Sequence, residues 1–389
     1  MRRDEEFWET AEDWSRRKHL ILQHYLTPAA AKLRQVSPDN RVIILDAFAG
    51  RGQYADGSPG SPILMGRLAD LCHSWSNPVH LRVYNLEPNR AGFQELEACT
   101  SPWVQQRVIS NLHGTFRQRL PSVLDEAGQS PLFAFLDPFR PKQLPFQDFV
   151  PLLMRTAVTE LCFVFHTPAV VRMLQAVRPQ ARTSESDRQK LMARLDEVFG
   201  SRRWEGLLSC ASLEPEAVVE RFQAEVLARG ERGRNYVCSH AIQARYGSGL
   251  KYHIVFFTRN PHGVRLMNDA FCRESREVYE QTGRTAQMAL FPNASAPPVE
   301  MERSERLGTL SNTLIGIGRE PARRHWKRGD LIFQSVIRRF GDFTESEHLQ
   351  ALKELMARRS GPRYRPVDGK PTKTGVWITN NQTLLSFLE

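Results

Sequence analysis

Hydrophobic residues recur along this chain with two spacings, one typical of strands and one typical of helices. Seven short runs rich in branched and aromatic residues predict buried strands, at residues 42–45, 79–86, 104–110, 132–136, 160–167, 236–245 and 252–259. Wider spacing between the first strands predicts helices, including residues 63–75 and 90–98. Residues 246–249 (Tyr-Gly-Ser-Gly) predict a hairpin between the last two strands. The pattern therefore indicates an α/β fold with a doubly wound sheet closed by a hairpin.

Other regions flank or interrupt this sheet. The N-terminal region has hydrophobic residues at near-helical spacing, with Pro28 predicted to interrupt the helix. Residues 168–232 are polar and rich in arginine, and they far exceed a usual strand–helix connection, so we expect a helical insertion. The chain then divides into an N-terminal helical segment, an α/β domain, a linker and a basic C-terminal domain, at residues 1–40, 41–285, 286–300 and 301–389.

Composition and charge narrow the class of protein. No hydrophobic run is long enough to cross a bilayer, and the charged N-terminus lacks a signal-peptide region, so we expect a cytoplasmic protein with no membrane partner. The net charge of +10 and pI near 9.5 make nucleic acid a reasonable partner, although such charge also occurs in proteins that bind none. The six cysteines form no Cys-x-x-Cys or Cys/His cluster, which argues against a metal site or a disulfide framework.

The first predicted strand ends in an acidic residue and a glycine turn. Asp46 follows the strand directly, and Gly50 and Gly52 formally match a dinucleotide fingerprint. The acid that NAD needs about 20 residues later is not well placed. S-adenosylmethionine (SAM) instead needs a carboxylate near its methionine end and a second one for its ribose, which Glu87 supplies at the end of the next strand. We therefore predict a SAM site; the alternative is that Asp46 caps a helix and Glu87 is a solvated strand end.

Further residues are predicted to contact this cofactor. Lys18 lies with Trp14 and Tyr25 in a helical segment that either folds over the cofactor or only covers the sheet edge. Phe48 lies inside the glycine turn. Thr115 follows the third strand, where it would reach the cofactor's base from the side unless this Gly-Thr pair is only a turn.

Asp137, Pro138 and Phe139 directly follow the fourth strand. Amino-group methyltransferases have an Asp/Asn-Pro-Pro-aromatic motif here, because an exocyclic amine is a poor nucleophile. An acid side chain and a proline-fixed carbonyl can accept its two hydrogens, while the aromatic ring stacks on the base. One proline is absent here, and an ordinary strand-ending turn is the alternative. His166 ends the fifth strand, where it lines the site or is a structural histidine.

The C-terminal region is the most basic part of the chain. Residues 302–389 contain 16 Lys and Arg against 10 Asp and Glu, so they contribute +6 of the +10. Helices near 322–340 and 344–359, followed by strands at 363–367 and 375–379, predict a winged helix that grips a phosphate backbone, or else a small helical domain with solvated cations. The candidate nucleic-acid contacts are His166, Arg172, Arg323, Arg324, Lys370 and Lys373.

Taken together, these motifs resemble the bacterial three-Cys-motif partner proteins (TcmP). The resemblance covers roughly residues 10–280 and lies in Trp14, Lys18, Tyr25, Leu26, the Asp46 to Gly52 stretch, Gly60 to Pro62, Phe135 to Phe139, Leu144 to Phe146 and Arg172. It implies the Rossmann-like fold of class I SAM-dependent methyltransferases, with seven strands and an antiparallel last one. It also implies a partner protein with a three-cysteine motif, of radical-SAM type. Arg140 departs from the family's usual glycine and His166 from its frequent asparagine. If that asparagine contacts substrate, the substrate or the activity differs here.

We predict a SAM-dependent methyltransferase that modifies an amino group of a nucleic-acid base, with Asp137, Pro138 and Phe139 positioning the acceptor. The rival interpretation is a catalytically silent adaptor on a methyltransferase scaffold, which binds nucleic acid or a radical-SAM-type partner. An NAD-dependent enzyme is a more distant third.

Overall fold

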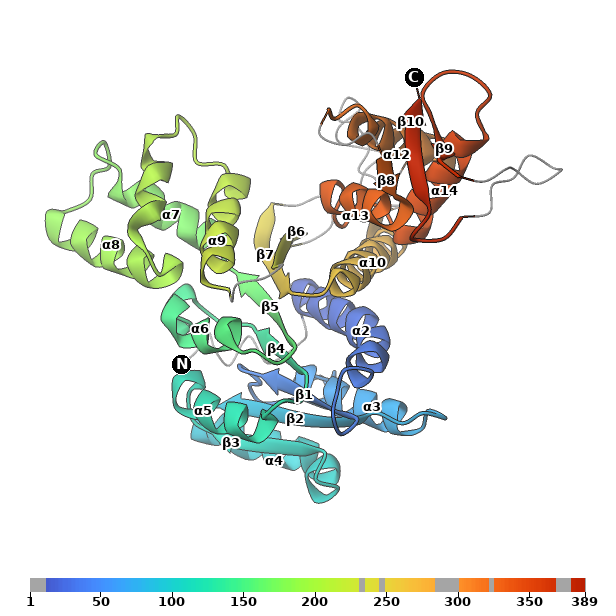
Figure 1. The fold of residues 1–389 in the computed structure, drawn as a ribbon. Coiled ribbons are helices and arrows are strands. Elements are labelled where there is room, and N and C mark those ends of the chain that lie inside the picture. The colour runs from blue at the N-terminus through green and yellow to red at the C-terminus, as the bar shows by residue number, and fades with distance from the viewer. Residues whose placement is uncertain are drawn as a thin grey trace. The chain divides into compact units, whose positions relative to one another are not determined.

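The computed structural model describes most of the chain, in two compact units, Met1–Gly263 and Val264–Glu389 (Figure 1). The described residues are 12–230, 235–244, 249–283, 301–321, 325–368 and 379–388. The predicted linker and four of the candidate nucleic-acid contacts lie outside them: residues 286–300, Arg323, Arg324, Lys370 and Lys373. Among the helices that are described, none is long and apolar enough to cross a membrane.

The first unit is built on a seven-stranded sheet. Its strands are β1 (Arg41–Asp46), β2 (His80–Glu87), β3 (Ile109–His113), β4 (Leu132–Leu136), β5 (Thr159–Phe165), β6 (Tyr236–Gln243) and β7 (Leu250–Thr258). Their order across the sheet is β3-β2-β1-β4-β5-β7-β6. The first five are parallel, whereas β7 is antiparallel to both β5 and β6. The predicted seven-stranded Rossmann-like sheet, with its closing hairpin and antiparallel last strand, is therefore confirmed.

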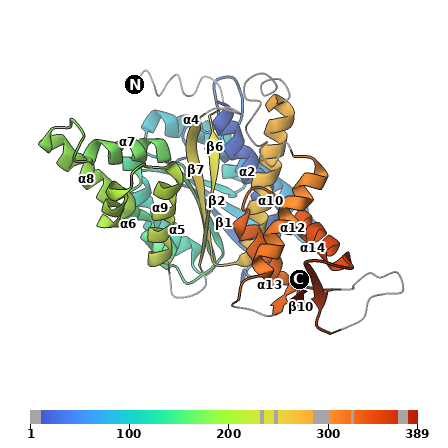
Figure 2. The same ribbon diagram turned by 90° about the horizontal axis from the view of Figure 1, so that it is seen from above.

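Helices cover both faces of this sheet. They are α2 (Asp13–Arg34), α3 (Ser61–His73), α4 (Arg90–Gln105), α5 (Phe116–Ala127), α6 (Phe146–Met154), α7 (Thr167–Val177), α8 (Glu185–Phe199) and α9 (Pro215–Arg229), with short 3₁₀ helices at Pro141–Gln143 and Arg202–Ser209. α2 packs on α3 and β1, and α3 packs on α4 and β2. The helices from α5 to α9 share one hydrophobic core with the other face, and Figure 2 shows α6 to α9 on the side of the sheet away from α2.

The region predicted as an insertion is helical where it is described, but it is not merely a polar appendage. Trp204 and Phe222 from this region are buried in the main core of the unit. The Phe222 ring lies 4.4 Å, centroid to centroid, from the Phe165 ring at the end of β5. The helices α7 to α9 therefore form part of the hydrophobic layer that supports the sheet.

Two predicted element boundaries are wrong because tertiary packing overrides local pattern. The third strand begins at Ile109 rather than residue 104, since α4 continues to Gln105. The Trp103 ring lies against Gly66 of α3, and its Nε1–H donates to Asp70 at 2.8 Å, which holds the last turn of α4. These contacts outweigh the strand propensity of the sequence that follows.

The N-terminal helix α2 continues through Pro28, where the sequence predicts an interruption. Proline removes one intrahelical hydrogen bond. The residues beyond it nevertheless remain buried, including Ala29, Ala30 and Leu33. Packing of this face on the sheet therefore keeps the helix continuous.

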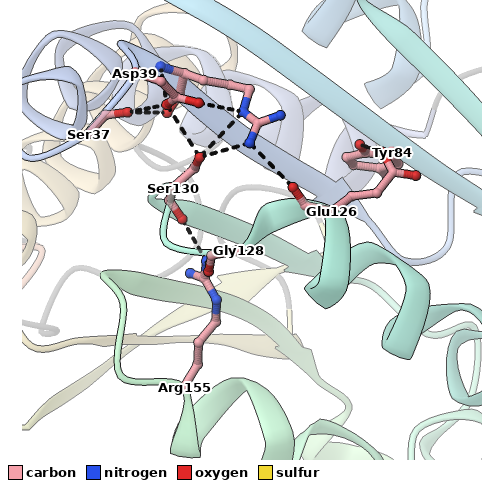
Figure 3. Close-up of polar contacts among 8 residues, drawn as sticks. Ser37, Asp39, Tyr84, Glu126, Gly128, Ser130 and Arg155 are labelled. Carbon is pink, nitrogen blue, oxygen red and sulfur yellow. Dashed lines mark hydrogen bonds and ion pairs between the residues drawn. The ribbon is translucent and has the colours of Figure 1, made fainter.

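A polar network holds the edge of the sheet where the parallel strands begin (Figure 3). Arg41 donates from Nε and a terminal nitrogen to the Ser130 hydroxyl, at 3.3 and 3.2 Å, and pairs with Asp39 at 3.2 Å. Arg155 donates to the carbonyls of Gly128 and Ser130 at 2.6 and 2.7 Å. The polar groups of this edge thus bond to one another.

The second unit contains helices packed on a small antiparallel sheet. After α10 (Pro261–Val278) and a π-helical turn (Tyr279–Gly283) come α12 (Arg303–Gly318), β8 (His325–Lys327), α13 (Arg328–Arg338), α14 (Glu345–Ala357), β9 (Arg363–Pro366) and β10 (Leu384–Leu388). The strand order is β8-β10-β9. The helices share a core centred on Leu314, Leu331, Leu352 and Tyr364.

Several sequence predictions in this unit need correction. The helix predicted at 322–340 begins only at Arg328, because residues 325–327 form β8. α12 was not predicted at all. The second hairpin strand was predicted at 375–379, of which 375–378 lie outside the described residues and Thr379 is not in a strand; the strand that pairs with both neighbours is β10.

Candidate active site

Three carboxylates lie at the edge of the first unit's sheet where the parallel strands end. Asp46, the last residue of β1, is in register with Asn85 of β2 and Phe135 of β4. Glu87 and Asp137 each stand two residues beyond those partners (87 − 85 and 137 − 135). The structure therefore brings together the three acids that the sequence predicts for cofactor and acceptor.

The glycine turn after β1 has backbone conformations that favour glycine. Gly50 and Gly52 have φ values of 63° and 79°. A Cβ on Gly52 would also lie 2.6 Å from the Sγ of Cys99. The Gly52 carbonyl accepts a hydrogen bond from the N–H of Gly60 at 2.9 Å, which joins the turn to the start of α3. This helix begins at Ser61 with Gly60 as its N-cap, two residues before the predicted start at residue 63.

Asp46 is fully buried, with 0% of its surface exposed. Its Oδ1 accepts the N–H of Phe48 at 3.3 Å. Its Oδ2 has no hydrogen-bond partner of normal geometry in the described part of the chain, although the Ser61 hydroxyl lies close enough to act on the carboxyl. Burial, opposed by Ser61 and the Phe48 N–H, raises the Asp46 pKa to about 6. A buried carboxylate oxygen without a hydrogen bond costs free energy in the folded state, and a cationic ligand could remove this cost by binding to it.

Glu87 connects the end of β2 to the glycine turn. Its Oε1 accepts the N–H of Asn89 at 2.6 Å. Burial raises the pKa of Glu87, while the N–H groups of Asn89 and Gly50 oppose this effect. The carboxylate is therefore held in place by main-chain donors at the mouth of the site.

Two adjoining cavities open at this edge, and both are lined by Phe48 and Phe139. The first has a volume of about 280 Å³ and is lined by Ser61 and Asp137 among others. The second has a volume of about 410 Å³ and is lined by Gly50, Glu87, Arg140 and Lys142 among others. The glycine turn and Glu87 thus border one cavity, and Asp137 borders the other.

The predicted acceptor motif already has partners from this chain. The Lys18 ammonium, only 8% exposed, forms an ion pair with Oδ2 of Asp137. The Nε2 of His166 lies 2.6 Å from the Pro138 carbonyl oxygen, so this nitrogen carries the proton and donates it. Burial lowers the pKa of His166, which keeps the ring neutral at pH 7.

The first residues of β7 also reach this edge, because β7 runs opposite to the strands that end there. The Lys251 Nζ lies 3.8 Å from the centre of the Trp14 ring. The Tyr252 hydroxyl donates to the Trp14 carbonyl at 2.6 Å, and the Lys18 Nζ lies 5.7 Å from the Tyr252 ring centre. These contacts join α2 to β7 and present two ammonium groups to the first cavity.

Some predicted residues have other positions. Thr115 caps α5, where its hydroxyl accepts the N–H of Gln118 at 3.4 Å, and it lines neither of the two cavities described above. Arg172 is exposed on α7 and also lines neither. Tyr25 is fully buried and donates to Glu160 inside the unit, so it is a structural residue rather than part of a cofactor lid.

Sequence reasoning missed several residues that line the first cavity: His19, Tyr54, Ser61, Lys251 and Tyr252. For the two residues of β7 a signal was available. An antiparallel last strand must begin where the parallel strands end, so its first side chains reach the same edge. Across the described residues, no group of three or more His, Cys, Asp or Glu is placed to hold a metal ion.

Comparisons with known proteins find only distant structural similarity. No family model and no curated protein sequence matches the chain. Solved structures that are similar include an O-methyltransferase from Bacillus cereus in complex with SAH (15% identity, 64% of this chain and 84% of that chain, TM-score 0.34). A second is the O-methyltransferase TomG from Streptomyces achromogenes in complex with SAM (14% identity, 66% of this chain and 95% of that chain, TM-score 0.29). A third is TYW2 from P. horikoshii in complex with MeSAdo (13% identity, 59% of this chain and 60% of that chain, TM-score 0.26). At these identities and TM-scores, the likeness carries no information about the reaction.

Proposed function

We propose that this protein is a SAM-dependent methyltransferase. The observation that carries the proposal is the buried Asp46 carboxylate, which has an oxygen without a hydrogen-bond partner among the described residues, beside a positive-φ glycine turn. This carboxylate suits the ammonium of the cofactor's methionine part. Glu87, two residues beyond the paired position on β2, suits the ribose hydroxyls.

The charges of these residues suit the cofactor; Gly50 and Glu87 line the second cavity, whereas Asp46 and Gly52 line neither of the two cavities. Asp46 would bind the ammonium group, and the main chain at Gly50 and Gly52 would lie beside the methionine part. Glu87 would accept hydrogen bonds from the ribose hydroxyls. When bound, SAM supplies an electrophilic methyl group on a sulfonium centre. The side chains around the first cavity would then hold the acceptor and exclude water.

Calorimetric titration of the full-length protein with SAM and, separately, with NAD tests the cofactor. We expect saturable SAM binding that Asp46→Asn weakens at least about tenfold, because a charge-assisted hydrogen bond contributes about 1.5–3 kcal/mol. Asp125→Asn, at an exposed position on α5, is the matched control and should bind SAM normally. Binding of NAD alone, or SAM binding that Asp46→Asn does not change, would contradict the proposal.

We further propose that the substrate is a nucleic acid. The support is the charge of residues 302–389, which carry +6 of the chain's +10. A winged-helix interpretation is supported by the order of elements from α12 onward, which is α12, β8, α13, α14, β9 and β10. In that interpretation Arg323, Arg324, Lys370 and Lys373 contact phosphates.

Fluorescence anisotropy with labelled RNA and DNA oligonucleotides over a salt series tests this part. Replacing Arg323, Arg324, Lys370 and Lys373 together by alanine should reduce the slope of log affinity against log salt by about 3–4. Replacing four cations elsewhere, at the exposed Lys32, Lys190, Arg182 and Arg203, is the matched control for net charge. An equal loss of slope in both variants would contradict a specific site in the tail.

The sequence predicts that the acceptor is a base amino group, with Asp137 and the Pro138 carbonyl as its hydrogen-bond acceptors. The adaptor interpretation competes with any methyltransferase activity. Nucleic-acid binding with no binding of SAM would favour the adaptor.

A further inference from the structure

More positive than negative groups line the first cavity. Lys18 and Lys251 both line it, and Asp137 is the one carboxylate among its described lining residues. His19 and His166 also line it. Burial lowers the pKa of both, that of His19 to about 4, so neither adds a charge at neutral pH. Burial and Lys18 lower the pKa of Lys251 as well, and Glu12 opposes this.

The two groups that an amino acceptor would use are already engaged. Oδ2 of Asp137 pairs with the Lys18 ammonium, and the Pro138 carbonyl accepts from the Nε2–H of His166. An exocyclic amine must place both of its hydrogens on acceptors to become nucleophilic. Here Oδ2 of Asp137 and the Pro138 carbonyl each have a donor from this chain, so Oδ1 of Asp137 is left to accept one hydrogen, which is enough for a hydroxyl but not for both hydrogens of an amine.

The charge that develops during transfer separates nitrogen from oxygen acceptors. An amine nitrogen becomes positive when it takes a methyl group, and a neighbouring ammonium opposes this. A hydroxyl oxygen becomes negative as its proton leaves, and an ammonium stabilises it. Lys18 and Lys251 therefore favour an oxygen acceptor.

We propose that the methyl acceptor is a hydroxyl oxygen, held by the Lys18 ammonium beside Asp137. This inference rests on the proposed methyltransferase function. The O–H bond breaks and its proton passes to Oδ1 of Asp137, the carboxylate oxygen other than the one that pairs with Lys18. The oxygen lone pair forms the bond to the methyl carbon, while the bond from that carbon to the sulfonium of the methyl donor breaks and its electron pair stays on sulfur.

The walls of the cavity suit a flat acceptor. Trp14, Tyr252 and Phe139 line it, and Phe139 is 44% exposed despite its large hydrophobic ring. Rings of this kind bind planar groups by stacking. An aromatic hydroxyl is therefore a suitable probe of the site.

Binding of para-nitrophenol to the full-length protein without cofactor tests the proposal, because the phenolate absorbs visible light and the phenol does not. We expect the bound probe to ionise more readily than in buffer, by about one pKa unit or about tenfold in phenolate preference. Para-nitroaniline, which has the same shape and an amino group, should bind at least about tenfold more weakly. Preferential binding of the aniline, or no binding of the phenol, would overturn the proposal.

Matched variants assign the effect to the cavity. Lys18→Gln should abolish the shift in ionisation, whereas Lys32→Gln, at an exposed position on the same helix, should retain it. Circular dichroism shows whether Lys18→Gln folds; Lys251→Gln, at a half-buried position, is the second variant and should reduce the shift. A shift that survives both substitutions would overturn the proposal.

Displacement of the phenolate by short oligonucleotides identifies where the hydroxyl comes from. Displacement by RNA but not by DNA of the same sequence supports a ribose hydroxyl, and displacement by neither supports a small hydroxylated molecule. Equal displacement by both would show recognition of the base or phosphate and would contradict the proposal. SAM calorimetry is independent of these measurements, so a failure of the cofactor proposal and a failure of the hydroxyl proposal are distinguishable.

Discussion

Asp46→Asn tests whether the carboxylate at the end of β1 serves ligand binding at the expense of folding stability. Burial is the main reason that the Asp46 pKa rises from 3.8 to about 6 in the folded protein. The difference is about two pKa units, and each corresponds to about 1.4 kcal/mol. At neutral pH Asp46 is mostly ionised in both the folded and the unfolded state, and because its pKa is higher in the folded state, the charged carboxylate lowers folding stability by up to about 3 kcal/mol.

The sign of the pH dependence follows from proton binding. Between the unfolded pKa and about pH 6, the folded protein retains a proton that the unfolded chain has lost. The contribution of Asp46 to stability therefore decreases as pH rises through this window and is lowest above it. Asparagine has nearly the same shape without the charge, and its side-chain oxygen can still accept the N–H of Phe48.

We therefore expect Asp46→Asn to stabilise the first unit near neutral pH while it weakens SAM binding. An unfolding entropy of about 2.1 cal/mol/K per residue over the 263 residues of this unit gives about 0.55 kcal/mol/K, so 3 kcal/mol corresponds to a rise in Tm of about 5 °C. Differential scanning calorimetry near neutral pH and below about pH 5 measures the rise, which should shrink at the lower pH. A lower Tm at neutral pH would show that the carboxylate has a stabilising partner and would refute the reasoning. Asp125→Asn is again the control.

Three further predictions concern packing. Gly52→Ala should destabilise the first unit by about 1–3 kcal/mol in urea unfolding, because φ is 79° there and the new Cβ would lie 2.6 Å from the Cys99 Sγ. Full rescue by an added Cys99→Ala would show that φ does not contribute. Tyr25→Phe removes the hydrogen-bond donor of the buried Glu160 and should destabilise the first unit by a similar amount, with the SAM affinity unchanged in calorimetry. A loss of SAM affinity would show that Tyr25 belongs to the cofactor site. Tyr364→Phe removes a 2.7 Å hydrogen bond to an α12 carbonyl and should lower the second unit's free energy of unfolding by about 1–2 kcal/mol, a prediction that an unchanged urea midpoint would contradict.

The parts of this site that could be predicted from sequence are those that strands carry to one edge by their own direction. Asp46, Glu87 and Asp137 each follow a short apolar run, and parallel strands must end on the same side of a sheet. Register then sets their relative positions. Local sequence was therefore sufficient to place all three acids together.

The parts that could not be predicted depend on contacts between distant segments. Lys18 and Asp137 are 119 residues apart, and no local pattern shows that they form an ion pair. The same holds for the end of α4, where Trp103 and its partner Asp70 decide between helix and strand. Thr115 is the opposite case, since its role as a helix cap is fully local, while its predicted contact with the cofactor stays a prediction.

The two edges of the sheet use their polar groups differently, and this difference locates the chemistry. Where the parallel strands begin, Arg41 donates to the Ser130 hydroxyl, and Arg155 donates to the main-chain carbonyls of Gly128 and Ser130 (Figure 3). Where they end, Asp46 is buried with an oxygen that lacks a partner among the described residues. The cations near it come from α2 and β7, which are not part of the parallel set. In the proposed function, the ends of the parallel strands would hold the cofactor, while Lys18 and Lys251 would determine which acceptor atom reacts.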